Sequence, residues 1–110
     1  MIIGIGCDVV ERSRITLSIG DKILSVKEKE LCKYFNEKRK LEFIAGRFAA
    51  KEAIIKAINK KGVLLSDIEV LYENDKPVCN YENYKILVSI SHDINTAIAF
   101  AICEGKNEVN

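Results

Sequence analysis

The stretch that decides the fold is FIAGRFAAKEAIIK, residues 43–56, which combines helix formers with many small residues. At about 100° per residue, one face of this helix carries Glu52 and Lys56 one turn apart, among apolar side chains. Those apolar neighbours are Leu41, Ala45, Phe48 and Ala49. A Glu–Lys pair at this spacing supports a helix by roughly 0.2–0.5 kcal/mol and is common on solvated faces. The pattern is therefore compatible with a functional pair and with one that only supports the helix.

The N-terminal segment MIIGIGCDVVERSRI, residues 1–15, predicts a buried strand because β-branched residues favour extended structure. Gly4 and Gly6 suit a bulge or the close approach of another group. Asp8 is the one carboxylate inside the apolar part of this segment. We therefore expect Asp8 to serve a function.

Three helices are expected after this strand, over residues 13–24, 25–35 and 37–59. Gly20 is interpreted as a C-cap or turn of the first helix. Ser25 and Glu28 have the spacing of a capping box at the start of the second.

The remaining chain alternates apolar and polar residues and predicts four strands, near residues 67–72, 77–80, 85–91 and 96–103. Turn residues separate them at 74–77 and 92–95. This order predicts an α+β fold of one domain, residues 1–110, with one long and two short helices on a mainly antiparallel sheet. The last two strands are apolar on both faces, which favours burial of one face against another subunit.

Composition limits the possible functions. A net charge of +1 argues against a nucleic-acid-binding surface, and no apolar run reaches the roughly 20 residues that span a bilayer. The start has no secretory pattern, so we expect a cytoplasmic protein without a membrane segment. The four cysteines show no CxxC spacing, which argues against zinc and favours free buried thiols.

Basic residues nevertheless gather in one 24-residue stretch, which makes an anionic ligand or partner plausible. They are Lys38, Arg39, Lys40, Arg47, Lys51, Lys56, Lys60 and Lys61.

Four polar residues thus stand on apolar elements: Asp8, Glu52, Lys56 and His92. Magnesium keeps several waters and takes one or two carboxylates beside substrate phosphates, so these residue types fit a magnesium and phosphate site. A simpler alternative for His92 is that it satisfies backbone groups at the end of a strand.

Three segments together closely resemble the signature segments of the holo-[acyl-carrier-protein] synthases, a family of 4'-phosphopantetheinyl transferases. They are GIGCDVVERSRI (4–15), AGRFAAKEAIIKAI (45–58) and VSISHDINTAIAFAI (88–102). The resemblance covers nearly the whole chain and implies transfer of the 4'-phosphopantetheine arm of coenzyme A to a serine of apo acyl carrier protein. Adenosine 3',5'-bisphosphate would be released, and the reaction would serve fatty-acid biosynthesis.

The resemblance also implies residue roles. Asp8 and Glu52 correspond to the family's metal-binding carboxylates and, with Lys56, to its catalytic residues; the metal would be Mg²⁺. Coenzyme A would be contacted by Lys56 and by a further set, Lys38, Arg39, Arg47, Pro77 and His92. A salt bridge to Glu11 or Glu42 is the simpler alternative for Arg47. Arg14 would contact an acidic helix of the carrier protein, although it could equally be a solvated charge.

Family members form trimers with active sites between subunits, so a homotrimer is implied here. The chain departs from the family pattern at Asn59, Lys60 and Lys61, which precede Gly62 where glycines are usual, and at Thr96, where an aromatic residue is common. The general base, the preference between Mg²⁺ and Mn²⁺ and the range of substrates stay open. A non-catalytic module that binds a nucleotide or acidic protein is the main alternative, and a purely structural trimer is a third.

Overall fold

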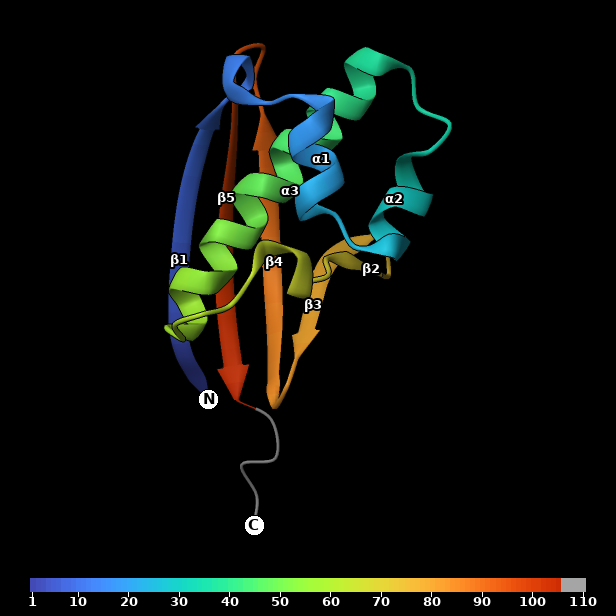
Figure 1. Cartoon of the computed structure of the whole chain (residues 1–110). Helices are drawn as coiled ribbons and strands as arrows, with labels where there is room; N and C mark the ends of the chain where they lie inside the picture. The colour runs from blue at the N-terminus through green and yellow to red at the C-terminus, as the bar shows by residue number, and fades with distance from the viewer. Residues whose placement is uncertain (106–110) are drawn as a thin grey trace.

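The computed structural model describes residues 1–105, which form one antiparallel five-stranded sheet with three helices on one face (Figure 1). The strand order is β1-β5-β4-β3-β2. The strands are β1 (Ile2–Glu11), β2 (Leu71–Glu73), β3 (Lys76–Tyr81), β4 (Tyr84–His92) and β5 (Thr96–Gly105). The predicted α+β fold is confirmed, and no helix in residues 1–105 is long and apolar enough to cross a membrane.

The helices are α1 (Leu17–Ile23), α2 (Val26–Cys32) and α3 (Glu37–Ile58). The capping box predicted from Ser25 and Glu28 is confirmed, since each side chain accepts a hydrogen bond from the other's backbone N–H. Asn59 ends α3 in the left-handed conformation, with φ 53°. The boundaries of α3 therefore agree with the prediction to within one residue.

Two glycines bring β1 against α3. A Cβ added to Gly6 would lie 1.9 Å from the carbonyl oxygen of Ala53, and one on Gly4 would lie equally close to that of Ala57. Side chains at either position would force strand and helix apart, so the close approach predicted for these glycines is confirmed. This contact fixes how far apart the functional groups on β1 and α3 can lie.

The β2–β3 hairpin turns through Asn74 and Asp75, which both have positive φ, 53° and 65°. Two such residues suit a tight turn whose twist matches the flanking strands. The turn predicted at 74–77 is therefore confirmed for Asn74 and Asp75, whereas Lys76 and Pro77 already belong to β3. The strand β2 is shorter than the predicted strand 67–72. A short 3₁₀ turn, Leu65–Asp67, occupies the start of that segment instead.

The prediction for Gly20 was wrong. Gly20 lies inside α1, where an added Cβ would come 2.5 Å from Cδ1 of Ile44 on α3. It therefore allows two helices to pack closely and does not end the first. The predicted helix over 13–24 is also divided, because Arg12–Arg14 forms a separate 3₁₀ turn before α1.

The core lies between α3 and the sheet and is built from small side chains of β5, Ala97, Ala99, Ala101 and Cys103. The opposite face of the sheet carries no helix (Figure 1). There Ile5 is 72% exposed and Phe100 55% exposed. The expectation that β1 is a buried strand is therefore wrong for the single chain, because only one of its faces is covered.

Candidate functional site

Asp8 and Lys56 meet where β1 crosses α3. The Nζ atom of Lys56 donates to the carbonyl oxygen of Cys7 at 2.9 Å and to Oδ1 of Asp8 at 3.3 Å. The side chain of Asp8 is largely buried, while that of Lys56 is more than half exposed. Two of the predicted catalytic residues are therefore in direct contact, although 48 positions separate them in the chain.

Glu52 belongs to the same place. Gly4 faces Ala57 and Gly6 faces Ala53 across the strand–helix contact. Asp8 is two residues further along the same face of β1, so it lies level with the preceding turn of α3. Glu52 lies four residues before Lys56 on α3, which is about one helical turn, and it is half-buried. The structure thus joins Asp8 to Lys56, with Glu52 one helical turn before Lys56 on α3. We call these three residues the carboxylate–lysine cluster.

The donor set of this cluster fits a hard divalent cation. Asp8 already accepts a hydrogen bond from an ammonium group, so its oxygens face a position that a positive charge can occupy. Within residues 1–105, no three or more His, Cys, Asp or Glu side chains gather as a metal site. Two carboxylates, with water and phosphate completing the shell, suit Mg²⁺ and do not suit zinc.

His92 lines a groove of about 250 Å³ at the other end of α3. The remaining lining residues are Phe35, Arg39, Glu42, Phe43 and Tyr72; we call this the His92 groove. The Arg39 guanidinium stacks 3.9 Å from the centre of the Phe35 ring. The groove thus combines flat aromatic surfaces with a cation and an imidazole, groups that suit a phosphorylated nucleotide.

The imidazole of His92 packs against Gly46, which has no side chain to displace it. A Cβ on Gly46 would lie 3.0 Å from both Cε1 and Nε2 of His92. Burial lowers the pKa of His92 below the ordinary 6.5; the Glu42 carboxylate opposes this and Arg12 adds to it. The native protein therefore favours the neutral imidazole.

This lowered pKa predicts a pH dependence of stability. The folded state binds fewer protons at His92 than the unfolded state, so the stabilisation is complete above pH 6.5 and is lost as the pH falls through the folded-state pKa. His92 is the one histidine of the chain. We expect His92→Gln to lose less stability than the unmodified protein between about pH 7 and 5.5 in urea titrations. Equal losses in both proteins would contradict the assignment.

Arg47 is placed differently from the prediction. Its side chain is buried, Nη2 donates to the carbonyl of Val70 at 3.0 Å, and Nε lies 3.7 Å from Oε2 of Glu28. The guanidinium is thus enclosed in the interior of the single chain, whereas the resemblance implies contact with coenzyme A. The alternative pairing with Glu11 or Glu42 is wrong, because the carboxylate beside Arg47 is that of Glu28.

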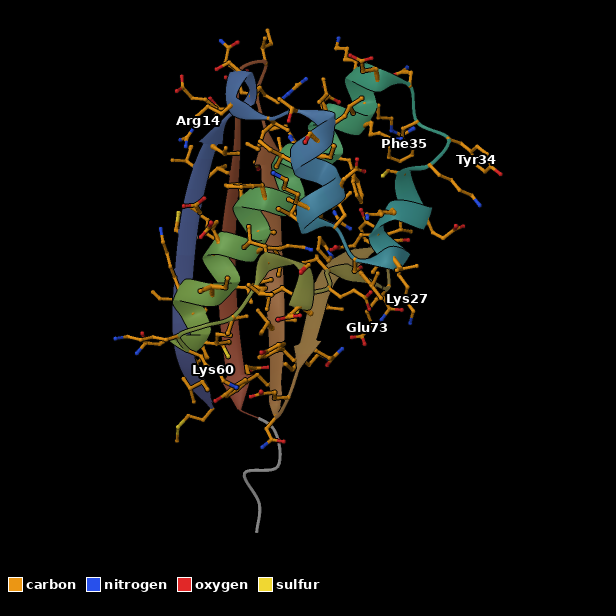
Figure 2. All side chains as sticks on the ribbon, in the orientation of Figure 1. Arg14, Lys27, Tyr34, Phe35, Lys60 and Glu73 are labelled. Atoms are coloured by element: carbon orange, nitrogen blue, oxygen red, sulfur yellow. The ribbon has the colours of Figure 1, made fainter. Side chains whose placement is uncertain are left out.

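The other predicted contacts lie at the surface. Lys38 is exposed on the first turns of α3, and Pro77 is half-buried on β3 opposite Tyr72. Arg14 is exposed on the turn between β1 and α1, as Figure 2 shows. Within one chain the structure brings Pro77 beside the His92 groove through Tyr72. The ligand roles of these residues stay predictions.

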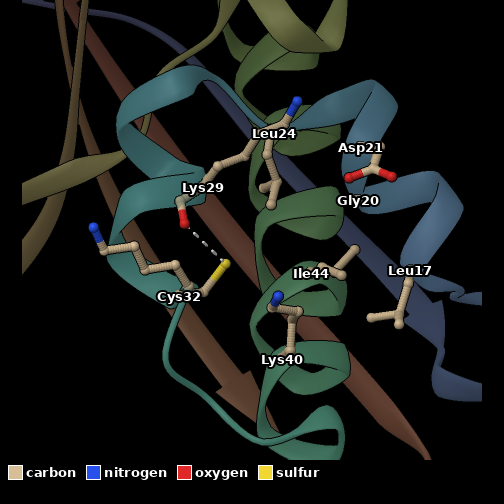
Figure 3. Close-up of a pocket in the computed structure, with 9 residues that line it drawn as sticks. Leu17, Gly20, Asp21, Leu24, Lys29, Cys32, Lys40 and Ile44 are labelled. Atoms are coloured by element: carbon tan, nitrogen blue, oxygen red, sulfur yellow. Dashed lines mark hydrogen bonds between the residues drawn. The ribbon is translucent and has the colours of Figure 1, made fainter.

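A larger cavity of about 390 Å³ lies between α1, α2 and α3 (Figure 3). Lys29, Lys33 and Lys40 line it, and Lys33 also pairs with Glu30 at 2.7 Å. Burial raises the pKa of the Cys32 thiol in its wall, although Lys40 opposes this. Cys32 is therefore a structural thiol, as predicted for buried cysteines. Cys7 differs from that prediction because it is exposed.

The sequence of residues 4–103 matches the family model of the 4'-phosphopantetheinyl transferase superfamily. The chain belongs to this superfamily. It is 44% identical to a holo-[acyl-carrier-protein] synthase of Staphylococcus saprophyticus, over 94% of this chain and 99% of the relative. A Geobacillus protein of the same name is 46% identical, over 94% and 98% of the two chains. The family resemblance predicted from the three segments is confirmed.

Solved structures of the superfamily share the fold. A holo-(acyl-carrier-protein) synthase from Bacillus anthracis, in complex with CoA (3',5'-ADP), is 37% identical with a TM-score of 0.84, covering 96% of this chain and 99% of that one. The Helicobacter pylori holo-[acyl-carrier-protein] synthase in complex with coenzyme A is 30% identical with a TM-score of 0.75, covering 91% and 99%.

Sequence reasoning missed the groups that shape the groove. Phe43 and Tyr72 contribute its aromatic walls, and Glu28 with Lys51 forms a fully buried ion pair behind it. Glu28 was recognised only as a helix cap and Lys51 only as one of several basic residues. No local pattern could have paired them, because their contact joins residues 23 positions apart.

Proposed function

We propose that this chain transfers the 4'-phosphopantetheine group of coenzyme A to a serine of apo acyl carrier protein for fatty-acid biosynthesis. The observation that carries the proposal is the contact of Asp8 with Lys56 beside Glu52, in a member of the 4'-phosphopantetheinyl transferase superfamily. A module that only binds nucleotides has no need for two carboxylates and a lysine in one cluster. Similarity to named holo-[acyl-carrier-protein] synthases over most of the chain supports the same activity.

In the proposed reaction, the serine hydroxyl of the carrier protein gives up its proton to a general base, and its oxygen attacks the phosphorus that bears the pantetheine arm. The bond from that phosphorus to the bridging oxygen breaks, and adenosine 3',5'-bisphosphate leaves. Such a step depends on alignment and on neutralising phosphate charge. Lys56 supplies one positive charge at the pyrophosphate. Mg²⁺ held by Asp8 and Glu52, when bound, would supply Lewis-acid stabilisation of charge on the phosphate oxygens.

We propose that the His92 groove binds the nucleotide end of coenzyme A. Arg39 and the neutral imidazole of His92 offer donors for phosphate, and the rings of Phe35 and Tyr72 offer flat surfaces. Lys38 directly precedes Arg39 on α3, and Pro77 pairs with Tyr72 across β2 and β3, so we propose that both contact the same ligand. The two complexes with coenzyme A or its bisphosphate product among the similar structures support this use of the fold.

The uncovered face of the sheet supports the proposed homotrimer. Three rows of the strand register place apolar residues side by side there, and one row joins Ile5, Ile102 and Leu87. All three side chains are exposed in the single chain. Contiguous apolar surface of this kind marks an interface between proteins. We propose that subunits pack through this face and that each active site combines groups from two neighbours, in a cytoplasmic enzyme.

The experiment that tests the activity is the intact mass of apo acyl carrier protein after incubation with this protein, coenzyme A and Mg²⁺. A parallel sample contains a chelator. We expect the carrier protein to gain one phosphopantetheine group, and the gain to disappear with the chelator. Coenzyme A binding without any gain would favour the non-catalytic binding module instead.

Two substitutions should separate the two substrates. We expect Lys56→Ala to raise KM for coenzyme A by about tenfold or more and that for carrier protein much less, because Lys56 lies in the carboxylate–lysine cluster. Arg14→Ala should do the reverse, because Arg14 is exposed and available to an acidic helix. Steady-state kinetics with each substrate varied in turn measures both values. Equal effects of both variants on both substrates would contradict this division.

A further inference from the structure

Glu28 is a fully buried carboxylate that the proposed chemistry does not use. Its Oε1 accepts hydrogen bonds from Nζ of Lys51 at 2.5 Å and from the backbone N–H of Ser25 at 2.9 Å. Its Oε2 accepts from the backbone N–H of Val70 at 2.8 Å and lies 3.7 Å from Nε of Arg47. One side chain of α2 thus joins α3 to the segment that leads into β2.

Stability alone does not account for this cluster. Taking three charged groups out of water is costly, and a well-packed apolar cluster of similar volume is often at least as stable as a buried ion pair. In addition, Nε of Arg47 has no hydrogen-bond partner within the described residues. The arrangement holds the guanidinium in one place, even though its hydrogen bonding is incomplete.

That place is between two walls of the His92 groove. The Cζ atom of Arg47 lies 4.3 Å from the ring centre of Phe43 and 5.1 Å from that of Tyr72. Both rings line the groove. Nη2 of Arg47 also binds the carbonyl of Val70, two residues before Tyr72. The guanidinium therefore sets the position of both rings from behind, without facing the ligand itself.

We infer that Glu28 and Arg47 are positioning residues for coenzyme A. Glu28 fixes the guanidinium of Arg47, and Arg47 fixes the Phe43 and Tyr72 rings that form the nucleotide-binding wall. This inference rests on the proposed function, because it assigns the His92 groove to the nucleotide end of coenzyme A. It replaces the predicted direct contact of Arg47 with a phosphate by an indirect role.

The variants that test it are Arg47→Lys and Glu28→Gln, with Lys51→Met as the matched control. Lysine keeps the charge but loses the planar fork and the stacking on both rings. Each carboxylate oxygen of Glu28 accepts hydrogen bonds in the unmodified protein. In Glu28→Gln the amide N–H₂ replaces one of these oxygens in either orientation, so a donor then faces another donor. Lys51→Met disturbs the same carboxylate on the side of α1, where Lys51 also binds the carbonyl of Ile23, and leaves the rings untouched.

We expect Arg47→Lys and Glu28→Gln to raise Kd and KM for coenzyme A by about tenfold while kcat and KM for carrier protein change less than about threefold. Lys51→Met should lower Tm at least as much and leave Kd for coenzyme A within about twofold. Calorimetric titration with coenzyme A measures Kd apart from catalysis. If the wild-type protein is active and both variants keep the wild-type Kd for coenzyme A, the inference is overturned. If the wild-type protein is inactive, the proposed function is overturned instead.

A double-mutant cycle keeps the inference testable if Glu28→Gln does not fold. Tyr72→Leu removes one ring and leaves the ion cluster intact. The cycle combines Arg47→Lys with Tyr72→Leu. If Arg47 acts through Tyr72, the double variant should raise Kd for coenzyme A by clearly less than the product of the two separate effects. Effects that multiply fully would overturn the indirect role of Arg47.

Discussion

Asp8→Asn and Glu52→Gln are each expected to lower kcat/KM for phosphopantetheine transfer by about a thousandfold. Removing one carboxylate charge weakens the binding of Mg²⁺, which contributes several kilocalories per mole of charge stabilisation in such reactions. The rate of mass gain of apo acyl carrier protein, at one fixed Mg²⁺ concentration that saturates the unmodified protein, measures the loss. Both substitutions keep the shape of the side chain, so the loss reports charge rather than packing.

Stability should change little in these variants. The contact of Asp8 with Lys56 is 3.3 Å long and its lysine is more than half exposed, so losing the ion pair costs about 1 kcal/mol or less. Glu11→Gln is the matched control, because Glu11 is an exposed carboxylate on the same strand. We expect that variant to keep full activity. Full activity in Asp8→Asn or Glu52→Gln would remove the metal assignment.

The sequence predicted the elements of the fold well where local chemistry determines them. The capping box of Ser25 and Glu28, the end of α3 near Asn59 and the turn at Asn74 and Asp75 each depend on a few neighbouring residues. The glycines of β1 were also informative, because alternation on a strand places both on one face. Local rules of this kind need no knowledge of the distant chain.

The candidate site was predictable in part. Asp8, Glu52 and Lys56 stood out because each is a charge on an apolar element, and the structure brings Asp8 into contact with Lys56. The interior role of Arg47 could not be predicted, since it depends on Glu28 of another helix and on Tyr72 of a short strand. Residue type alone does not distinguish a guanidinium that meets a phosphate from one enclosed by a carboxylate and two rings.

For the outer face of the sheet, the sequence predicted an apolar surface but not what covers that surface. Apolar residues on both faces of β5 predict a second covered surface, but in the single chain this face carries no helix and its apolar side chains are exposed. In the single chain Phe100 stands on this face between Cys7 of β1 and Ser89 of β4. If a neighbouring subunit covers this face, a charge introduced at Phe100 should strongly weaken the association of the subunits.

Phe100→Glu is expected to dissociate the proposed trimer. The substitution would place a carboxylate in the middle of the apolar face, and burying an unpaired charge in an interface costs several kilocalories per mole. Three subunits each lose this energy, so association should weaken by at least about a hundredfold. Sedimentation equilibrium at micromolar concentration measures the change. Transfer activity should fall with the trimer fraction and recover as the protein concentration rises.

Val26→Glu is the control for this effect. Val26 is also an exposed apolar residue, 81% exposed, but it stands on α2, which lies on the helical side of the sheet (Figure 1). That variant should remain trimeric and active, because its carboxylate stays in water. A trimer that persists in Phe100→Glu would show that the subunits meet elsewhere. An active wild-type monomer would show that one chain holds the complete site, with the carboxylate–lysine cluster and the His92 groove serving the same bound coenzyme A.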